Sequence, residues 1–326
     1  MDKRNQTVTY FIIKGISELP ELQVPVFILV LLLYLSTLFG NVIILVLVCR
    51  ERQLHTPMYF FLSNLSILDM SSTTVTLQKT LTTFVTGGKF VSFVGCMAHV
   101  YFFMALECTE LLILGIMSYD RYMAVCNPLH YQMIMSYRLC VLLAAICWMA
   151  GFVEVIPHTS ILSHFSCYTT NVINHFFCDV LPLMKISCSD VSLLKLWIMT
   201  EGVFVSGLIP LFMTVIPYIF IISAILKIRT STGRRKAFYT CSSHLTIVVL
   251  LYVTLYCLYL SPASENSLDS HKLFSLFNTA AVPLLNPIIY SLKNKEVKTA
   301  TKKLLSSLYA KLKQCVNSNV LRTLKP

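Results

Sequence analysis

Several carboxylates of this chain occur where water is scarce. Asp69, Glu107 and Glu110 lie inside long apolar runs, and Asp120 with Arg121 directly follows another. An ionised side chain in hydrocarbon is costly unless it is paired or used. Asp120 and Arg121 can neutralise each other as an ion pair at a helix end, whereas the three acids inside the runs must hold protons or share a cation.

The composition indicates that lipid surrounds much of the chain. Of 326 residues, 56% are hydrophobic and 13% are charged, which is more apolar material than one water-soluble core can bury. A net charge of +11 could indicate nucleic-acid binding, but the basic residues lie in the connections between apolar runs rather than on one face. We therefore expect a lipid bilayer, and no nucleic acid, as a partner.

Seven apolar runs are long enough to cross the hydrocarbon core of a bilayer. Backbone groups must be hydrogen-bonded inside lipid, and the runs do not show the short alternating pattern of barrel strands, so each run is predicted to be a helix. The fold class is therefore an all-α membrane protein, a seven-transmembrane helix bundle. The predicted helices are 24–49, 58–78, 91–125, 139–157, 196–228, 237–260 and 273–292.

The distribution of basic residues predicts the orientation. Most of the 26 Lys and Arg residues fall in connections that face the cytosol if the N-terminus is outside. Asn5 begins an Asn-Gln-Thr glycosylation acceptor on that outer side. We expect a plasma-membrane protein with an extracellular N-terminus at 1–23, a seven-helix bundle at 24–292, and a cytoplasmic amphipathic helix and tail at 293–326.

An ordered set of motifs runs along the whole chain. It comprises Gly40-Asn41, the segment LHTPMYFFL at 54–62, Asp120-Arg121-Tyr122, the segment KAFYTCSSHL at 236–245 and the segment PLLNPIIY at 283–290. Together these motifs resemble the odorant receptors, which are rhodopsin-like G-protein-coupled receptors. The chain departs from the usual pattern at Asn127 and Tyr239, and both positions lie on the cytosolic side.

The resemblance implies a ligand-activated receptor and no enzyme. A small, volatile odorant would bind within the helix bundle, and a stimulatory, olfactory-type heterotrimeric G protein would be activated and raise cyclic AMP. By resemblance, Arg121 leaves Asp120 on activation while Tyr218 and Tyr290 move towards it. Pro287 cannot donate a backbone hydrogen bond, so the seventh helix can form a hinge there. The residues that the resemblance assigns to activation and coupling are Asp120, Arg121, Tyr122, Tyr218, Asn286, Pro287 and Tyr290.

Four cysteines fall on the predicted outer side, namely Cys96, Cys167, Cys178 and Cys188. Four cysteines allow three pairings, and the sequence alone does not choose between them. The resemblance implies a bridge between Cys96 and Cys178, with Cys167 and Cys188 closing a second ring inside the same loop.

The resemblance also implies a role for two of the buried acids. Asp69 and Glu110 match positions that face each other across the bundle in related receptors and can hold sodium, so a sodium ion is the one possible cofactor. The alternative is that both acids are protonated and hydrogen-bond to neighbours such as Asn41, Ser66 and Asn286.

Helical register predicts the wall of a ligand pocket. Phe103, Met104 and Glu107 recur on one face of the third helix, and residues of the fifth, sixth and seventh helices would face them. Such a wall is mostly apolar with few polar groups. The predicted lining is Phe103, Met104, Glu107, Val203, Ser206, Gly207, Tyr252, Leu255, Tyr256, Tyr259, Leu276 and Thr279.

Glu107 needs a neutralising partner if this pocket is dry. Three partners are open: a proton, a cation shared with Glu110, or a basic ligand held among Phe103, Tyr256 and Tyr259 by cation–π attraction.

Two other classes of function are weighed against the receptor. The buried acids could serve a transporter or a proton or cation pathway, but the chain shows no internal repeat or paired interrupted helices. An intramembrane aspartyl hydrolase is disfavoured because the motifs of hydrolases and phosphate-binding loops are absent from the sequence.

Overall fold

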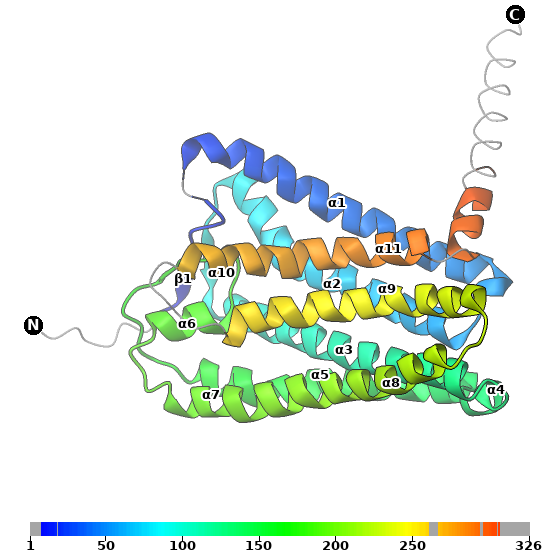
Figure 1. Ribbon diagram of the computed structural model, residues 1–326. Coiled ribbons are helices and arrows are strands. Elements are labelled where there is room, and N and C mark those ends of the chain that lie inside the picture. The colour runs from blue at the N-terminus through cyan, green and yellow to red at the C-terminus, as the bar shows by residue number, and fades with distance from the viewer. Residues whose placement is uncertain (1–7, 18, 261–266, 294–295, 305, 307–326) are drawn as a thin grey trace, which may run out of the picture.

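The computed structural model describes residues 8–17, 19–260, 267–293, 296–304 and 306. Within these residues, seven long helical segments lie side by side as a bundle (Figure 1). We number the segments 1 to 7 in chain order. Segments 1 to 4 are α1 (Pro20–Arg50), α2 (Pro57–Thr86), α3 (Phe93–Cys126) and α5 (Tyr137–Ser163).

The last three segments each change helical type along their length. Segment 5 consists of α7 (Ser192–Trp197), η2 (Ile198–Leu208) and α8 (Ile209–Leu226). Segment 6 is α9 (Ser231–Leu255) followed by η3 (Tyr256–Leu260), and segment 7 is α10 (Ser267–Leu276), η4 (Phe277–Ala281) and α11 (Val282–Lys293). The stretches η2, η3 and η4 are π-helical, a form that often marks functional sites.

The predicted seven-helix bundle is confirmed, although composition alone distinguishes only part of it. Five described helices are long and apolar enough to span a membrane by that criterion. The second segment is not among these five helices, because the polar side chains of α2 lower its mean hydropathy. These polar side chains are buried inside the bundle, namely Ser66, Asp69, Ser72, Thr73 and Thr76. A helix can be polar inside a bundle and still face lipid with its apolar side.

The third segment forms the centre of the bundle. Helix α3 packs against α2, α5 and α8, and α11 closes the bundle against α1 and α9. Close approach of α3 to α5 requires Gly151, where a Cβ atom would lie 3.0 Å from the Ala105 carbonyl oxygen. Ser92 caps the first turn of α3 through its hydroxyl, and Gly87 ends α2 with a φ of 68°.

A small sheet and a loop cover one end of the bundle. Strand β1 (Tyr10–Ile13) pairs antiparallel with β2 (Phe90–Ser92) and parallel with β3 (Val172–Ile173). The disulfide from Cys96 to Cys178 joins the start of α3 to the long loop, and a second disulfide joins Cys167 to Cys188. Both pairings are those that the family resemblance implies. The loop also contains the short helix α6 (Val180–Ile186).

The opposite end carries the short connections and the start of the C-terminal helix. Helices η1 (Arg52–Leu54) and α4 (Tyr131–Ile134) lie in the connections there. Residues 296–304 are helical and dock on this end, where Glu296 accepts a 2.7 Å hydrogen bond from Tyr59 and Lys303 pairs with Glu51 at 3.0 Å. Most of the predicted tail lies outside the described residues, as does Asn5.

Candidate functional site

A cavity of about 230 Å³ lies inside the bundle beneath the disulfide-tethered loop. Segments 3, 5 and 6 supply most of its wall, as register predicts. The residues predicted from the sequence that line it are Phe103, Met104, Glu107, Val203, Ser206, Gly207, Tyr252, Leu255 and Tyr256.

Leu276 and Thr279, the residues predicted from segment 7, do not line this cavity. Leu276 packs instead against the buried cluster around Val30 and Leu77, on the side of segments 1 and 2. Thr279 is buried, donates its hydroxyl to the Ser275 carbonyl at 2.8 Å, and accepts at its own carbonyl from Thr73. The side chain of Tyr259 lies outside the described residues, so its role stays a prediction.

Register reasoning missed two sources of lining. The loop contributes Asp179, Val180 and Leu181, whose position depends on the disulfide rather than on any helix period. The predicted faces of segment 5 and of α3 both continue along the helix beyond the residues named from the sequence. The other lining residues that the sequence analysis did not name are Cys108, Leu111, His158, Ile198, Met199, Gly202, Leu208 and Leu211.

Glu107 is held by a polar chain that crosses three segments. Asn278 donates from Nδ2 to Glu107 Oε2 at 3.1 Å, and Thr254 donates its hydroxyl to Asn278 Oδ1 at 3.0 Å. The carboxyl group therefore has a protein partner, which the sequence analysis did not foresee. The signal was available in the polar pair Thr254 and Asn278 within apolar segments, where a polar side chain needs a partner.

Two further carboxyl groups lie at or near the cavity, Asp179 in its wall and Glu154 beside the lining residue Ser206. Asp179 accepts a 2.7 Å hydrogen bond from the backbone N–H of Val180, and burial raises the pKa of Asp179 to about 6. Glu154 on α5 accepts a hydrogen bond from the Ser206 hydroxyl, and it is a further carboxylate inside a bundle helix that the sequence analysis overlooked. Both ring nitrogens of His158 are buried without a hydrogen-bond partner among the described residues, and none of the lining residues is Lys or Arg.

Asp69 and Glu110 lie deeper in the bundle and differ in their contacts. Asn286 donates from Nδ2 to both carboxyl oxygens of Asp69, at 2.9 and 3.0 Å. Glu110 Oε1 and Asn286 Oδ1 are buried and have no hydrogen-bond partner among the described residues. Asn41 donates instead to the carbonyls of Thr37 and Pro283. Unpartnered buried oxygens beside two acids fit a hard cation, which prefers oxygen ligands.

The Asp120-Arg121-Tyr122 motif forms a closed ion pair. Arg121 donates to Asp120 Oδ2 from Nη2 at 2.9 Å and from Nε at 3.2 Å, and Asp120 is fully buried. The Tyr131 hydroxyl donates to Asp120 Oδ1 at 2.8 Å. Burial and the neighbouring carboxylate raise the pKa of Tyr131, so the phenol stays protonated and able to donate. Tyr131 is a third member of this group that the sequence analysis did not name.

The remaining predicted activation residues lie around this ion pair. Tyr218 donates to the Cys241 carbonyl at 3.2 Å and pairs with His244 Nδ1 at 2.9 Å, so it joins segments 5 and 6 rather than contacting Arg121. Tyr122 packs against Phe220. Pro287 is buried at the crossing of segments 7 and 1, where its ring lies against Gly40. The side chain of Tyr290 lies outside the described residues.

The bundle has the fold of the rhodopsin-like receptors. It is similar to squid rhodopsin with a TM-score of 0.68 and 17% identity, covering 90% of this chain and 88% of that chain. The family profile described as olfactory receptor matches residues 30–308. Mouse olfactory receptor 8U3 is 43% identical over 94% of this chain and 96% of its own length, and human olfactory receptor 8G1 is 44% identical over 93% and 97%.

The chain therefore belongs to the olfactory receptor family. It is a membrane protein and a signalling receptor of the G-protein-coupled class rather than an enzyme. The alternatives of a transporter and of an intramembrane hydrolase are set aside on this ground.

Proposed function

We propose that this receptor resides in the plasma membrane with its N-terminus outside and binds a small, volatile-sized odorant in the cavity beneath the loop. The odorant activates a stimulatory, olfactory-type heterotrimeric G protein, and cyclic AMP rises. The observation that supports the proposal is that one helix connects the two regions. Helix α3 contributes Phe103 and Glu107 to the cavity and carries the Asp120–Arg121 ion pair at its opposite end.

The cavity supports a small ligand. Its volume of about 230 Å³ is below the roughly 300–1,000 Å³ of pockets for drug-sized molecules. Its wall is largely aromatic and aliphatic, with a few polar groups that can orient one functional group of the ligand.

The orientation rests on two observations. The basic residues concentrate on the end opposite the sheet and the loop. Both disulfides lie at the loop end, and disulfides persist in the oxidising environment outside the cell.

Activation requires a shift between two states of the bundle. The closed Asp120–Arg121 pair describes the resting state, and an odorant can shift the population only by binding the active state more tightly. Pro287 and the π-helical stretches of segments 5 to 7 supply places where the helices can change their course without unpairing the whole backbone.

A cyclic AMP reporter with a mixed odorant panel tests the proposal, and a cavity-filling variant localises the site. Gly202 lines the cavity and a Cβ atom there would meet only Ile198, at 3.7 Å, so Gly202→Phe adds volume without a backbone clash. We expect it to abolish the response to any active odorant. Val205→Phe on the exposed side of the same segment is the matched control and should respond normally. Equal responses of the two variants would place the odorant elsewhere.

A further inference from the structure

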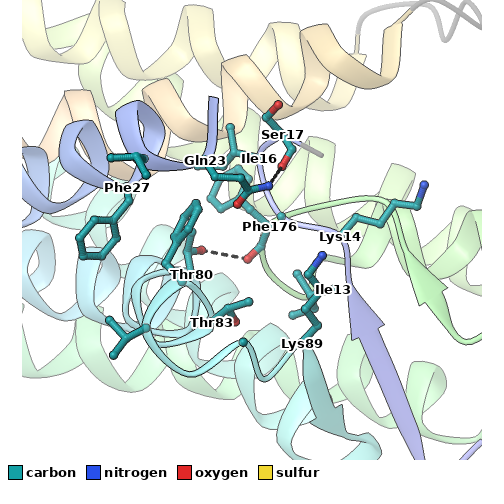
Figure 2. A pocket seen from close by; sticks show the side chains of 15 residues that line it. Ile13, Lys14, Ile16, Ser17, Gln23, Phe27, Thr80, Thr83, Lys89 and Phe176 are labelled. Atoms are coloured by element: carbon teal, nitrogen blue, oxygen red, sulfur yellow. Dashed lines mark hydrogen bonds between the residues drawn. The ribbon is translucent and has the colours of Figure 1, made fainter. Parts of the chain in front are cut away.

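A second, larger cavity lies at the loop end between segments 1 and 2 (Figure 2). Its volume is about 510 Å³, and its described lining residues are all different from those of the odorant cavity. The connection from β1 to α1 forms one side, and the outer turns of α1 and α2 form the others. Nothing in the proposed odorant mechanism uses this space.

The body of this second cavity is apolar. Phe27, Phe84 and Phe176 line it, together with Ile13 and Ile16. Two further aliphatic residues stand at its edge on the outer surface of the bundle, where Val24 is 65% exposed and Val85 is 75% exposed. These side chains would face acyl chains of the surrounding bilayer, so a hydrocarbon chain can enter from the membrane.

The rim of the cavity is positively charged. Lys14 and Lys89 are among its lining residues, and no described lining residue is acidic. In Figure 2, Lys89 directs its ammonium along Ile13, whereas Lys14 extends outward from the opening. The Lys89 ammonium makes no hydrogen bond or ion pair with the described residues. It is therefore available to an anion.

Neighbouring contacts fix the position of Lys89. Lys79 donates from Nζ to the carbonyls of Gly88 and Phe90, at 3.1 and 3.0 Å, so the turn that carries Lys89 is held on both sides. The backbone N–H of Ile13 donates to the Lys89 carbonyl at 2.9 Å. These hydrogen bonds hold the backbone at Lys89, while its exposed side chain stays free to reach an anion at the rim.

The helix dipole adds to the same potential. Helix α1 begins at Pro20 beside the cavity, and its N-cap residue Leu19 provides no side-chain hydrogen bond. The positive end of the α1 dipole therefore faces the same rim as Lys89. Hydroxyl groups of Ser17 and Thr83 add polar contacts at this level.

We propose that this cavity binds an anionic amphiphile, with one hydrocarbon chain against Phe27 and Phe84 and its acidic head group at Lys89. A free fatty acid and an anionic bilayer lipid share this chemistry. The site is distinct from the odorant cavity, so its occupancy does not depend on the proposed signalling function.

The structure also connects the two cavities through aromatic contacts. Phe176 lines the amphiphile cavity and its carbonyl accepts from the Thr80 hydroxyl at 3.0 Å. The ring of Phe176 lies 4.9 Å from that of Phe177, which lies 5.0 Å from that of Phe103 in the odorant cavity. An amphiphile that shifts Phe176 is therefore expected to change odorant potency, and this consequence alone rests on the proposed function.

Direct photolabelling tests the binding site. The whole receptor is reconstituted in nanodiscs of phosphatidylcholine and labelled with a diazirine derivative of laurate, and the labelled peptides are identified by mass spectrometry. We expect saturable labelling of α1 and α2 that excess laurate suppresses, whereas dodecanol and dodecyltrimethylammonium compete at least about tenfold more weakly, because they lack the charge-assisted contact. Equal competition by the three compounds, or labelling confined to other segments, would overturn the proposal.

Variants of Lys89 separate a specific site from general lipid contact. Lys89→Gln should reduce labelling of α1 and α2 by about tenfold, and Lys89→Arg should retain it. Lys195→Gln is the matched control, because Lys195 is an exposed lysine outside this cavity. Undiminished labelling in a folded, surface-competent Lys89→Gln variant rejects the assignment.

Changing the lipid composition of the nanodisc distinguishes the two sources of the amphiphile. If phosphatidylserine in the disc suppresses laurate labelling, an anionic bilayer lipid occupies the site; if only added laurate suppresses it, the ligand is a free fatty acid. Failure of both to compete overturns the site. If the receptor gives no odorant response but is still labelled by the laurate probe, the proposed odorant function is contradicted and the amphiphile site is not.

Discussion

The sequence and the structure indicate different partners for the Glu107 carboxyl group. In the sequence it is an isolated acid in an apolar helix, which requires a proton, a cation or a basic ligand. In the structure Asn278 donates to it at 3.1 Å, and Thr254 completes the chain. A protonated Glu107 satisfies this chain without any ligand, so we favour a neutral carboxyl group that packs segments 3, 6 and 7 together.

Substitution of Glu107 separates these alternatives. We expect Glu107→Gln to leave the potency of neutral alcohols nearly unchanged, because an amide oxygen can accept from Asn278 as the carboxyl oxygen does. Glu107→Ala should impair the receptor, since it leaves a buried donor unpaired at a cost of about 1–3 kcal/mol. The measurement compares aliphatic amines with alcohols of matched chain length in the cyclic AMP assay. An amine-selective potency loss of about tenfold in Glu107→Gln would instead show that Glu107 is a ligand counter-ion.

Arg121 is expected to act in the active state rather than in packing. We expect Arg121→Ala to abolish odorant-driven cyclic AMP while surface expression stays largely intact, because its guanidinium contacts only Asp120 through hydrogen bonds in the resting structure. Surface labelling of the intact cells provides the control. Full signalling by a normally expressed Arg121→Ala receptor would contradict the proposed role.

Tyr131 should restrain the resting state. Its hydroxyl donates to the Asp120 oxygen that Arg121 does not use, so Tyr131→Phe removes one hydrogen bond and leaves the ring in place. A net loss of about 0.5–1.5 kcal/mol from the resting state raises the active fraction by roughly two- to tenfold. Basal cyclic AMP without odorant measures this effect. Tyr137→Phe, which changes an exposed tyrosine on α5, should leave basal activity unchanged.

At the scale of whole elements, apolar run length predicts the helices because each must satisfy its own backbone in lipid. The ordered motifs resemble one family, and that resemblance implied both disulfides. Register located the inward face of segments 3, 5 and 6, since side chains one turn apart share a face. Leu276 and Thr279 on segment 7 do not line the cavity, because Leu276 packs in the buried cluster with Val30 and Leu77 and the Thr279 carbonyl accepts from Thr73.

Two features of the site were not predicted from the sequence. Asp179 reaches the cavity through a loop whose course follows from the Cys96–Cys178 bridge, so only tertiary structure places it. Segment 5 also lines the cavity one and two turns before Ser206, at Gly202 and Ile198, which the predicted lining did not include. A strand at Tyr10–Ile13 was also unforeseen, because its partners are distant in sequence.

The loop tether should be required for folding at the cell surface. Cys96→Ser or Cys178→Ser releases the loop that contributes Asp179, Val180 and Leu181 to the wall of the cavity. Loss of a native disulfide costs about 2–5 kcal/mol in small secreted domains, so we expect strongly reduced surface expression. Cys49→Ser removes an exposed free thiol and serves as the control. Normal surface levels of both tether variants would show that loop packing suffices without the bond.

The proposed function requires the whole molecule to transmit odorant binding at one end of the bundle to a G protein at the other. Helix α3 spans this distance, and segments 5 to 7 surround it with π-helical stretches and proline residues. The Asp69–Asn286 contact joins segments 2 and 7 midway. A cluster at this depth can bias the equilibrium between resting and active bundles without contacting either the odorant or the G protein.

We expect a sodium ion to bind at this midway cluster. Asp69 already accepts two hydrogen bonds from Asn286, whereas Glu110 Oε1 and Asn286 Oδ1 are buried and have no partner among the described residues. We propose that sodium uses these oxygens and stabilises the resting state. Replacing sodium by N-methylglucamine should then raise basal nucleotide exchange in purified receptor with its G protein, within the roughly 1–3 kcal/mol typical of coupled sites.

Glu110→Gln should weaken this sodium response, because the amide has no negative charge to offer the cation. Glu154→Gln provides the matched control, since Glu154 is a carboxylate on another segment that Ser206 already contacts. If Glu110 is instead a protonated packing residue, Glu110→Gln will keep the parent's response to sodium, and the two acids will have only a structural role. The comparison of the two glutamine variants therefore decides whether the centre of the bundle is an ion site or a hydrogen-bonded joint.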